Sequence, residues 1–298
     1  MTIIMNGAYF NGLDGSGLQT ALTQIPGSVT TDYILFSLNV PSGTSADSQF
    51  GLSGPFLAQG GQATAATENL LASVVKAGVG KGKCQRVWLS VGSANSPTFK
   101  NIQAILTAGG ALRSTLLTNF GAIVRILGQI AGVEAVGLDM DYEESVGDLA
   151  AIVADVTVAL YEALRCPVTF CPFQALPVLH PSSSPWIKAL QLVYAKLGIQ
   201  PVVGFNLQIY AGGTGNDPTR WTKAVASAAR TGIADPTAFI WPIFSCDTTA
   251  GPTRTPAEVS RQMAAWQSKG ASLWATASLP YQGFNLAGYG EAIGARLS

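Results

Sequence analysis

Eight short apolar segments alternate with helical stretches along this 298-residue chain. Short apolar, β-branched runs predict buried strands, and longer stretches with helical periodicity predict helices. Because no linker or change of composition divides the alternation, the sequence predicts one domain, residues 1–298, folded as an α/β protein of the (β/α)8 TIM-barrel type. The expected strands cover residues 2–10, 32–40, 85–91, 133–141, 167–173, 202–210, 239–244 and 271–275, and the expected helices cover 18–24, 63–77, 111–130, 147–164, 185–197, 218–231, 256–269 and 286–296.

One long connection interrupts this regular pattern. Residues 41–61 are rich in Ser, Gly and Thr and carry no clear periodicity, so we expect a long loop after the second strand. Loops of this length inside a compact domain usually serve a function.

The charge of the chain argues against a nucleic-acid partner, and its hydropathy argues against a membrane span. Lys and Arg together number 17, as do Asp and Glu, and the basic residues do not cluster, so we expect no nucleic-acid partner. No run of 18 apolar residues is present, so we expect no membrane span. We expect a monomer.

The cellular location follows less directly from composition. Only 11% of residues are charged, so the surface must consist largely of Ser, Thr, Asn, Gln and Gly, as in many exported enzymes. Residues 1–10 have neither the basic start nor the sustained apolar core of a signal peptide. We expect a secreted protein whose signal was removed or that leaves the cell by another route, with a cytoplasmic location as the alternative.

Metal and disulfide chemistry have little support. The spacing of Cys84, Cys166, Cys171 and Cys246 matches no zinc site, and the single His180 excludes a His-based site. We expect four buried free thiols, with disulfides as the alternative, and neither metal nor cofactor.

The segment 135–144 begins as an apolar strand and ends in acidic residues. Because side chains alternate along a strand, Asp139, Asp141 and Glu143 share one face. Enclosing three carboxylates together costs several kcal/mol unless charge is shed or paired. TIM-barrel active sites lie at the carboxyl ends of the strands, so this arrangement predicts catalytic acids. A solvated acidic edge strand, or a Mg²⁺ or Ca²⁺ ion held by the three acids, is the alternative.

Other polar and aromatic residues fall at the ends of the other expected strands, where they would surround these acids. Glu144 faces away from the three acids, and we expect it to be solvated. Each aromatic residue could instead belong to the barrel core. The candidates for substrate binding or catalysis are Tyr9, Gln174, Gln208, Tyr210 and Trp274.

The segment 137–143 resembles the D-G-x-D-x-D-x-E signature on the fourth strand of family 18 glycoside hydrolases, the chitinases and endo-β-N-acetylglucosaminidases. Residues 89–93 are similar to the family's S-x-G-G, and 208–210 resembles the Q-x-Y of plant-type chitinases. Trp274 stands where the family places the Trp beneath the sugar, and residues 7–10 resemble its aromatic first strand. Val136 replaces the first Asp of the signature, which in the family helps to hold the charge state of the middle acid, and Ser93 replaces the second Gly of S-x-G-G.

The resemblance implies a retaining, substrate-assisted reaction with Asp139, Asp141, Glu143 and Tyr210 as catalytic residues. Burial and the neighbouring Asp141 charge should raise the pKa of Glu143, as a general acid requires. In the family the acetamido oxygen of the substrate attacks the anomeric carbon. Asp141 would then orient the acetamido N–H, Tyr210 would donate to its oxygen, and Trp274 would pack on the sugar.

The expected substrate is β-1,4-linked N-acetylglucosamine, in chitin or chito-oligosaccharides, with Tyr9, Gln174, Gln208 and Trp274 binding it. Two alternatives remain open. One is an endo-β-N-acetylglucosaminidase that acts on N-glycans, and the other is a non-catalytic, chitinase-like sugar-binding protein.

Overall fold

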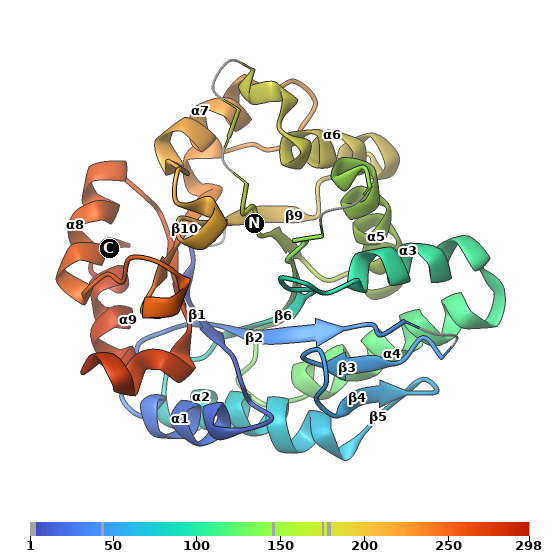
Figure 1. Cartoon of the computed structure of the whole chain (residues 1–298), viewed down its shortest axis with the longest axis horizontal. Coiled ribbons are helices and arrows are strands. Elements are labelled where there is room, and N and C mark those ends of the chain that lie inside the picture. The colour runs from blue at the N-terminus through green and yellow to red at the C-terminus, as the bar shows by residue number, and fades with distance from the viewer. Residues whose placement is uncertain (1–3, 43–44, 145–146, 175, 178–179, 298) are drawn as a thin grey trace.

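The computed structural model describes residues 4–42, 45–144, 147–174, 176–177 and 180–297. In these residues eight parallel strands form a closed barrel, because β1 pairs with both β2 and β11, and helices surround it (Figure 1). The (β/α)8 prediction is therefore confirmed. The barrel strands are β1 (Asn6–Phe10), β2 (Asp32–Asn39), β6 (Arg86–Val91), β7 (Ala135–Met140), β8 (Val168–Phe170), β9 (Val202–Gln208), β10 (Ile240–Ser245) and β11 (Ala271–Trp274).

Most helices lie where the apolar periodicity predicts them, with ends that differ by a few residues. The first helical turn of α8 carries a capping box, in which the Thr255 side chain accepts from the Glu258 N–H and the Glu258 side chain accepts from the Thr255 N–H. The predicted helices are α1 (Ser16–Gln24), α2 (Ser73–Lys81, preceded by the π-helical turn η1, Thr67–Ala72), α4 (Gly110–Gly128), α5 (Leu149–Leu164), α6 (Pro185–Leu197), α7 (Pro218–Ser227), α8 (Pro256–Trp266) and α9 (Leu286–Gly294). Short 3-10 turns are η2 (Pro181–Ser183), η3 (Ala211–Gly213), η4 (Pro236–Ala238), η5 (Thr248–Ala250) and η6 (Thr276–Gln282).

The helix α3 (Thr98–Ala108) was not predicted. It buries Phe99, Ile102 and Ile105 at helical spacing. No neighbouring side chain caps its first turn. Instead, the carboxylate of Glu144, 45 residues further along the chain, accepts from the Phe99 N–H at 2.6 Å. A helix whose start is fixed by a distant residue gives a weak signal in its own sequence.

The prediction of a loop without regular structure over residues 41–61 is wrong. β3 (Ser48–Phe50) pairs antiparallel with β2, β4 (Phe56–Gln59) pairs with β3, and β5 (Gln62–Ala63) completes the extension. This small sheet lies outside the barrel, beside α4 (Figure 1). The buried Asn119 of α4 holds it, accepting from the Gly61 N–H at 2.7 Å and donating to the Ala46 carbonyl at 2.8 Å.

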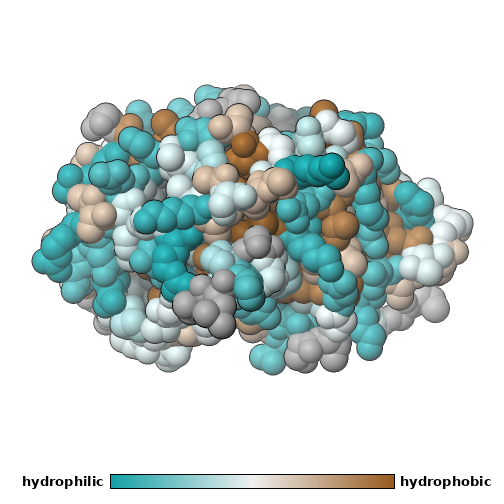
Figure 2. All heavy atoms as spheres, turned by 90° about the horizontal axis from the view of Figure 1, so that it is seen from above, coloured by the Kyte–Doolittle hydropathy of each residue, from teal (hydrophilic) through white to brown (hydrophobic). Residues whose placement is uncertain are grey.

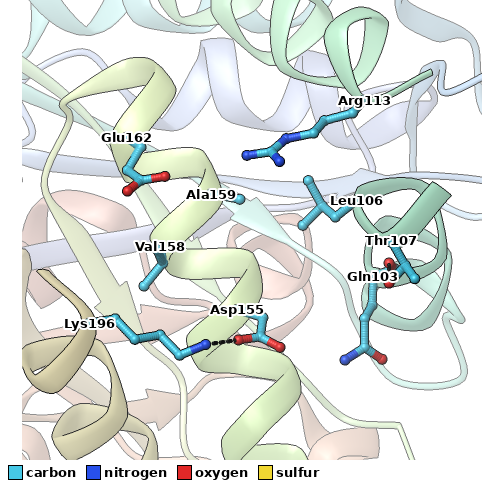
Figure 3. Close-up of a pocket in the computed structure, with 9 residues that line it drawn as sticks. All are labelled: Gln103, Leu106, Thr107, Arg113, Asp155, Val158, Ala159, Glu162 and Lys196. Atoms are coloured by element: carbon cyan, nitrogen blue, oxygen red, sulfur yellow. Dashed lines mark hydrogen bonds and ion pairs between the residues drawn. The ribbon is translucent and has the colours of Figure 1, made fainter. Parts of the chain in front are cut away.

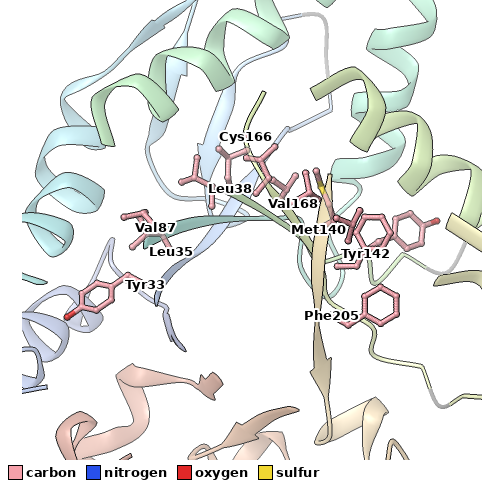
Figure 4. Close-up of a cluster of buried hydrophobic side chains, with 14 of the residues drawn as sticks. Tyr33, Leu35, Leu38, Val87, Met140, Tyr142, Cys166, Val168 and Phe205 are labelled. Atoms are coloured by element: carbon pink, nitrogen blue, oxygen red, sulfur yellow. The ribbon is translucent and has the colours of Figure 1, made fainter. Parts of the chain in front are cut away.

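The apolar core lies mainly between the strands and the helices. Figure 4 shows part of this layer, in which outward-facing side chains of successive strands pack under the helices, among them Tyr33 and Leu35 of β2, Val87 of β6, Met140 of β7 and Phe205 of β9. The four cysteines are buried and free, as expected. None of the helices in the described residues is long and apolar enough to cross a bilayer.

A second, smaller core fills the barrel interior below the strand ends. Trp88 and Trp241 are fully buried there. A Cβ atom at Gly137 would lie 2.4 Å from the Trp88 ring, and one at Gly204 would lie 2.2 Å from the Trp241 ring. Glycine is therefore required at both positions, and the two indoles form the floor beneath the acidic residues.

The amino-terminal end of the barrel is closed by an ion pair. Asp32 is fully buried and accepts from Arg86 Nε at 2.6 Å and from Arg86 Nη2 at 2.7 Å. Thr31 and Trp88 donate to the same carboxylate at 2.7 and 3.1 Å. This network lies at the end of the barrel opposite to the acids of β7.

Candidate active site

The acidic segment turns its carboxylates into the barrel and its apolar residues toward the helices. Val136, Leu138 and Met140 belong to the core under the helices, whereas Asp139 lies inside the barrel. A Cβ atom at Gly128 of α4 would lie 3.7 Å from Val136. Because Val136 faces α4 rather than the barrel interior, the side chain at this position does not contact the acids.

Asp139 is fully buried and accepts four hydrogen bonds. Thr169 and Asn206 donate to Oδ1 at 2.6 and 2.9 Å, and Tyr9 and Ser90 donate to Oδ2 at 3.0 and 3.2 Å. Burial raises the pKa of Asp139, and these donors oppose that rise. Both carboxylate oxygens are thus directed at N–H and O–H groups from β1, β6, β8 and β9, which disfavours a metal ion there. The described residues contain no cluster of acid, His or Cys side chains arranged to hold one.

Asp141 and Glu143 follow the end of β7 and share one hydrogen-bond donor. Gln208 Nε2 lies 2.9 Å from Glu143 Oε1 and 3.3 Å from Asp141 Oδ1. Burial raises the pKa of both carboxyls, and the charges of Glu143 and Asp139 raise the pKa of Asp141 further. Asp141 is buried and Glu143 half-buried, so the pair keeps a proton at pH values where ordinary carboxyls are ionised.

These two carboxyls line a cavity of about 170 Å³ at the mouth of the barrel. The rings of Tyr210 and Trp274 stack at 6.1 Å with an angle of 14°, and Phe36 packs edge-on against Trp274 at 4.6 Å. The peptide bonds Phe36–Ser37 and Trp274–Ala275 are cis. The lining residues are Tyr9, Phe36, Ala94, Asp141, Glu143, Cys171, Gln208, Tyr210, Ala211, Ala250 and Trp274.

The structure brings most of the predicted site residues together. Asp139 lies beneath the cavity, and Gln174 is exposed and outside the cavity lining. Because β8 ends at Phe170, Gln174 does not lie at the tip of the strand. Cys171 lines the cavity in its place. The other predicted residues, Tyr9, Asp141, Glu143, Gln208, Tyr210 and Trp274, all line the cavity.

Sequence reasoning missed several residues of the site. Phe36 and Cys171 lie at positions of two predicted strands whose side chains point into the barrel. The alternation of side chains along these strands could therefore have identified both residues. Ala211 and Ala250 come from short turns after β9 and β10, for which the sequence carries no comparable signal. Thr169 and Asn206, two donors to Asp139, are also revealed by parity once the strands are assigned.

Glu144 is not the solvated residue that we expected. Its carboxylate is half-buried and accepts from the backbone N–H groups of Phe99 and Lys100 at 2.6 and 3.2 Å. It therefore fixes the start of α3 against the end of β7, next to Glu143. An acidic side chain at a helix amino terminus is favoured by the exposed N–H groups.

A larger hollow of about 320 Å³ lies elsewhere, on the outer surface formed by α3, α4, α5 and α6. Figure 3 shows its mixed lining, with Arg113 and Glu162 on opposite sides and Lys196 paired to Asp155 at 2.5 Å. None of the predicted site residues lines this hollow, and it is separated from the acids by the helix layer.

No protein-family model matches the sequence, and no curated protein matches it. Solved structures do match. A family 18 chitinase from Pseudoalteromonas aurantia is 14% identical over 97% of this chain and 99% of that chain, with a TM-score of 0.65. A chitinase from Bacteroides thetaiotaomicron is 11% identical over 96% and 95%, with a TM-score of 0.60.

This chain has the fold of family 18 chitinases. A β-mannanase from the blue mussel Mytilus edulis is also similar, at 10% identity over 96% of this chain and 89% of that chain and a TM-score of 0.54. Because these identities are low, the likeness establishes the fold alone.

Proposed function

We propose that the protein is a retaining glycoside hydrolase that cleaves β-1,4-linked N-acetylglucosamine, in chitin or chito-oligosaccharides, by substrate-assisted catalysis. The observation that carries the proposal is the pair Asp141 and Glu143, which meet on the amide of Gln208 in the wall of a cavity lined by aromatic rings.

Glu143 is assigned as the general acid. It is half-buried, so a glycosidic oxygen in the cavity can reach it, and burial raises its pKa. A protonated carboxyl near neutral pH is what the departing sugar oxygen requires. After the first step the same residue, now ionised, would take a proton from water and return to its starting state.

The positions of the other carboxyls support substrate assistance. A protein nucleophile in a retaining glycosidase stands across the scissile bond from the acid. Asp141 accepts from the same nitrogen as Glu143 and so lies beside it, and Asp139 is closed off by its four donors. With no described carboxyl opposite Glu143 in the cavity lining, the acetamido oxygen of the substrate is the nucleophile that fits.

The remaining lining suits a neutral N-acetylated sugar. Asp141 would accept from the acetamido N–H, Tyr210 would donate to its oxygen, and Trp274 would pack against the methyl group and the sugar face. None of the described residues that line the cavity is a Lys or Arg that could pair with an acidic sugar.

One assay tests the substrate. The protein is incubated with chitopentaose and, separately, with a high-mannose glycoprotein, and the products are analysed by mass spectrometry. Cleavage of chitopentaose supports the proposal, and cleavage of the glycoprotein alone would reassign the enzyme to N-glycans. Binding of chitopentaose without cleavage would favour a non-catalytic sugar-binding protein. A thiazoline analogue of the cyclic intermediate should inhibit competitively, and failure to bind would contradict substrate assistance.

We also propose that the protein acts outside the cell as a monomer. The low share of charged residues supports export, and the face in Figure 2 is mostly hydrophilic, with hydrophobic residues gathered in small recesses. Light scattering should give a mass near 30.9 kDa, and twice that mass would contradict the monomer. Recovery of the protein from the culture medium rather than from cells tests export.

A further inference from the structure

Asn216 is a buried amide outside the cavity lining, and the proposed mechanism assigns no role to it. Its side chain is 7% exposed and lies in the segment between β9 and α7. Its Nδ2 donates to the carbonyl of Gln208 at 2.9 Å, and its Oδ1 accepts from the Trp221 indole N–H at 2.8 Å. The reversed amide would set N–H against N–H and oxygen against oxygen, so only this orientation fits.

The carbonyl that Asn216 holds belongs to Gln208, the last residue of β9. The chain turns back closely on this carbonyl, since a Cβ atom at Gly213 would lie 2.2 Å from its oxygen. The Gln208 N–H is tied to the segment after β8, because it donates to the Pro172 carbonyl at 3.0 Å. The backbone of Gln208 is thus held at both its N–H and its C=O, at the point where its side chain enters the cavity.

Trp221 fixes Asn216 from the helix layer. It is fully buried in α7, and its ring packs edge-on against Phe205 of β9, at 5.6 Å and 82°. Phe205 and Gln208 are three positions apart on one strand, so their side chains point to opposite faces. A continuous series of contacts therefore runs from the outer face of β9 through Trp221 and Asn216 to the carbonyl of Gln208.

We propose that Asn216 is a positioning residue, whose bridge between Trp221 and the Gln208 carbonyl holds the Gln208 amide where it reaches both acids of the cavity. One nitrogen of this amide lies 2.9 Å from Glu143 and 3.3 Å from Asp141. Hydrogen bonds weaken steeply with distance and angle, so a small rotation at the end of β9 loses at least one of the two. This inference rests on the proposed function, because it concerns the donor that the two acids of that mechanism share.

The kinetic test compares Asn216→Leu with the control Asn119→Leu. Asn119 is also a buried amide that accepts from one N–H and donates to one carbonyl, but it holds the β3–β5 extension outside the barrel. The Gln208 N–H favours the ionised carboxylates. Its displacement in Asn216→Leu should move both limbs of the pH profile of kcat/KM on chitopentaose to higher pH, by about half a unit, and lower kcat/KM by about 3- to 10-fold. Asn119→Leu should also cost stability but leave both limbs in place.

A double variant separates positioning from a general loosening of the fold. If Asn216 acts through the Gln208 amide, Asn216→Leu should move the limbs no further once Gln208→Met is present. An equal further movement in that background, or unmoved limbs in Asn216→Leu alone, would overturn the proposal. If Asn216→Leu does not fold, Asn216→Ser and Asn119→Ser replace the pair, because serine is too short to bridge Trp221 and the Gln208 carbonyl.

A second readout needs no activity. Infrared difference spectra of the free protein follow carboxyl protonation with pH, and subtraction of the Asp141→Asn and Glu143→Gln spectra assigns the two signals. The other titratable groups that face this pair stay the same in every variant at Asn216, namely Asp139, Tyr9, Cys171 and Tyr210. A shift of the pair to higher pH supports the proposal, and an unchanged titration contradicts it. If the wild-type protein does not cleave chitopentaose, the proposed function fails, while the infrared titration still decides the role of Asn216.

Discussion

The side-chain amide of Gln208, at the end of β9, lies 2.9 Å from the carboxylate of Glu143, which follows β7, with β8 between the two strands. The same nitrogen lies 3.3 Å from Asp141. One uncharged residue therefore sets the spacing of the two acids in the cavity and favours the ionised form of each.

Glu143→Gln should leave the fold intact and lower kcat on chitopentaose by about 10²- to 10⁴-fold, because it removes the proton donor. The substitution keeps the shape of a half-buried side chain, so thermal unfolding should be unchanged. Turnover measured by product release checks the effect. A variant that retains most of its activity would sink the assignment of the acid.

Gln208→Met should move both limbs of the pH–rate profile to higher pH and lower kcat/KM by about 10- to 100-fold. Its amide favours the ionised carboxylates, so loss of the amide raises the pKa of the pair. The control is Gln191→Met, whose amide bonds the Ala229 carbonyl on the outer surface. Equal profiles for the two variants would refute the shared-donor role.

Asp141→Asn should lower activity less than Glu143→Gln, because Asp141 orients the substrate rather than protonating it. It should also change how stability depends on pH. The folded protein raises the pKa of Asp141 above its ordinary value of 3.8, so the unfolded chain loses this proton first. Between those two pKa values the free energy of unfolding falls as pH rises, by at most about 1.4 kcal/mol per pH unit.

Urea unfolding from pH 4 to pH 8 measures this slope. The wild-type protein should lose stability more steeply than Asp141→Asn as pH rises, and the variant should be the more stable of the two at neutral pH. Parallel curves would mean that Asp141 ionises without hindrance in the folded state.

Thr169→Val should destabilise the protein by about 1.5–3 kcal/mol, because it removes the 2.6 Å hydrogen bond to the buried Asp139 without changing the size of the side chain. Thr157→Val is the matched control. Thr157 is also fully buried, but its hydroxyl has no hydrogen-bond partner among the described residues, so its replacement should be neutral or stabilising. Urea midpoints for the two variants decide the matter, and similar losses would argue against the Asp139 network.

Arg86→Met should cost about 3–5 kcal/mol, because it leaves Asp32 buried without its partner. The residual folded protein should keep its activity per molecule, since this pair lies at the opposite end of the barrel from the acids. Lys76→Met, which breaks the exposed pair with Glu68, should cost less than about 1 kcal/mol. A similar cost for both variants in calorimetry would contradict the buried role of Asp32.

The helix α3 and the β3–β5 extension show where sequence patterns are insufficient. The start of α3 depends on Glu144, and the extension depends on Asn119, both far away along the chain. A pattern of neighbouring residues carries no information about partners at such separations. Val136 differs, because strand alternation alone places its side chain on the face opposite the acids, and the structure adds that it packs against α4.

The sequence by itself determined the barrel and the shared face of Asp139, Asp141 and Glu143, because both depend on strand and helix periods of a few residues. The tertiary structure decided the surroundings of each acid and therefore how strongly it holds its proton. Closing the barrel brings four donors from separate strands onto Asp139, gives Asp141 a longer hydrogen bond of 3.3 Å from Gln208, and leaves Glu143 half-buried at the mouth. Proton affinity depends on these surroundings, and they are assembled only when strands distant in the chain become neighbours.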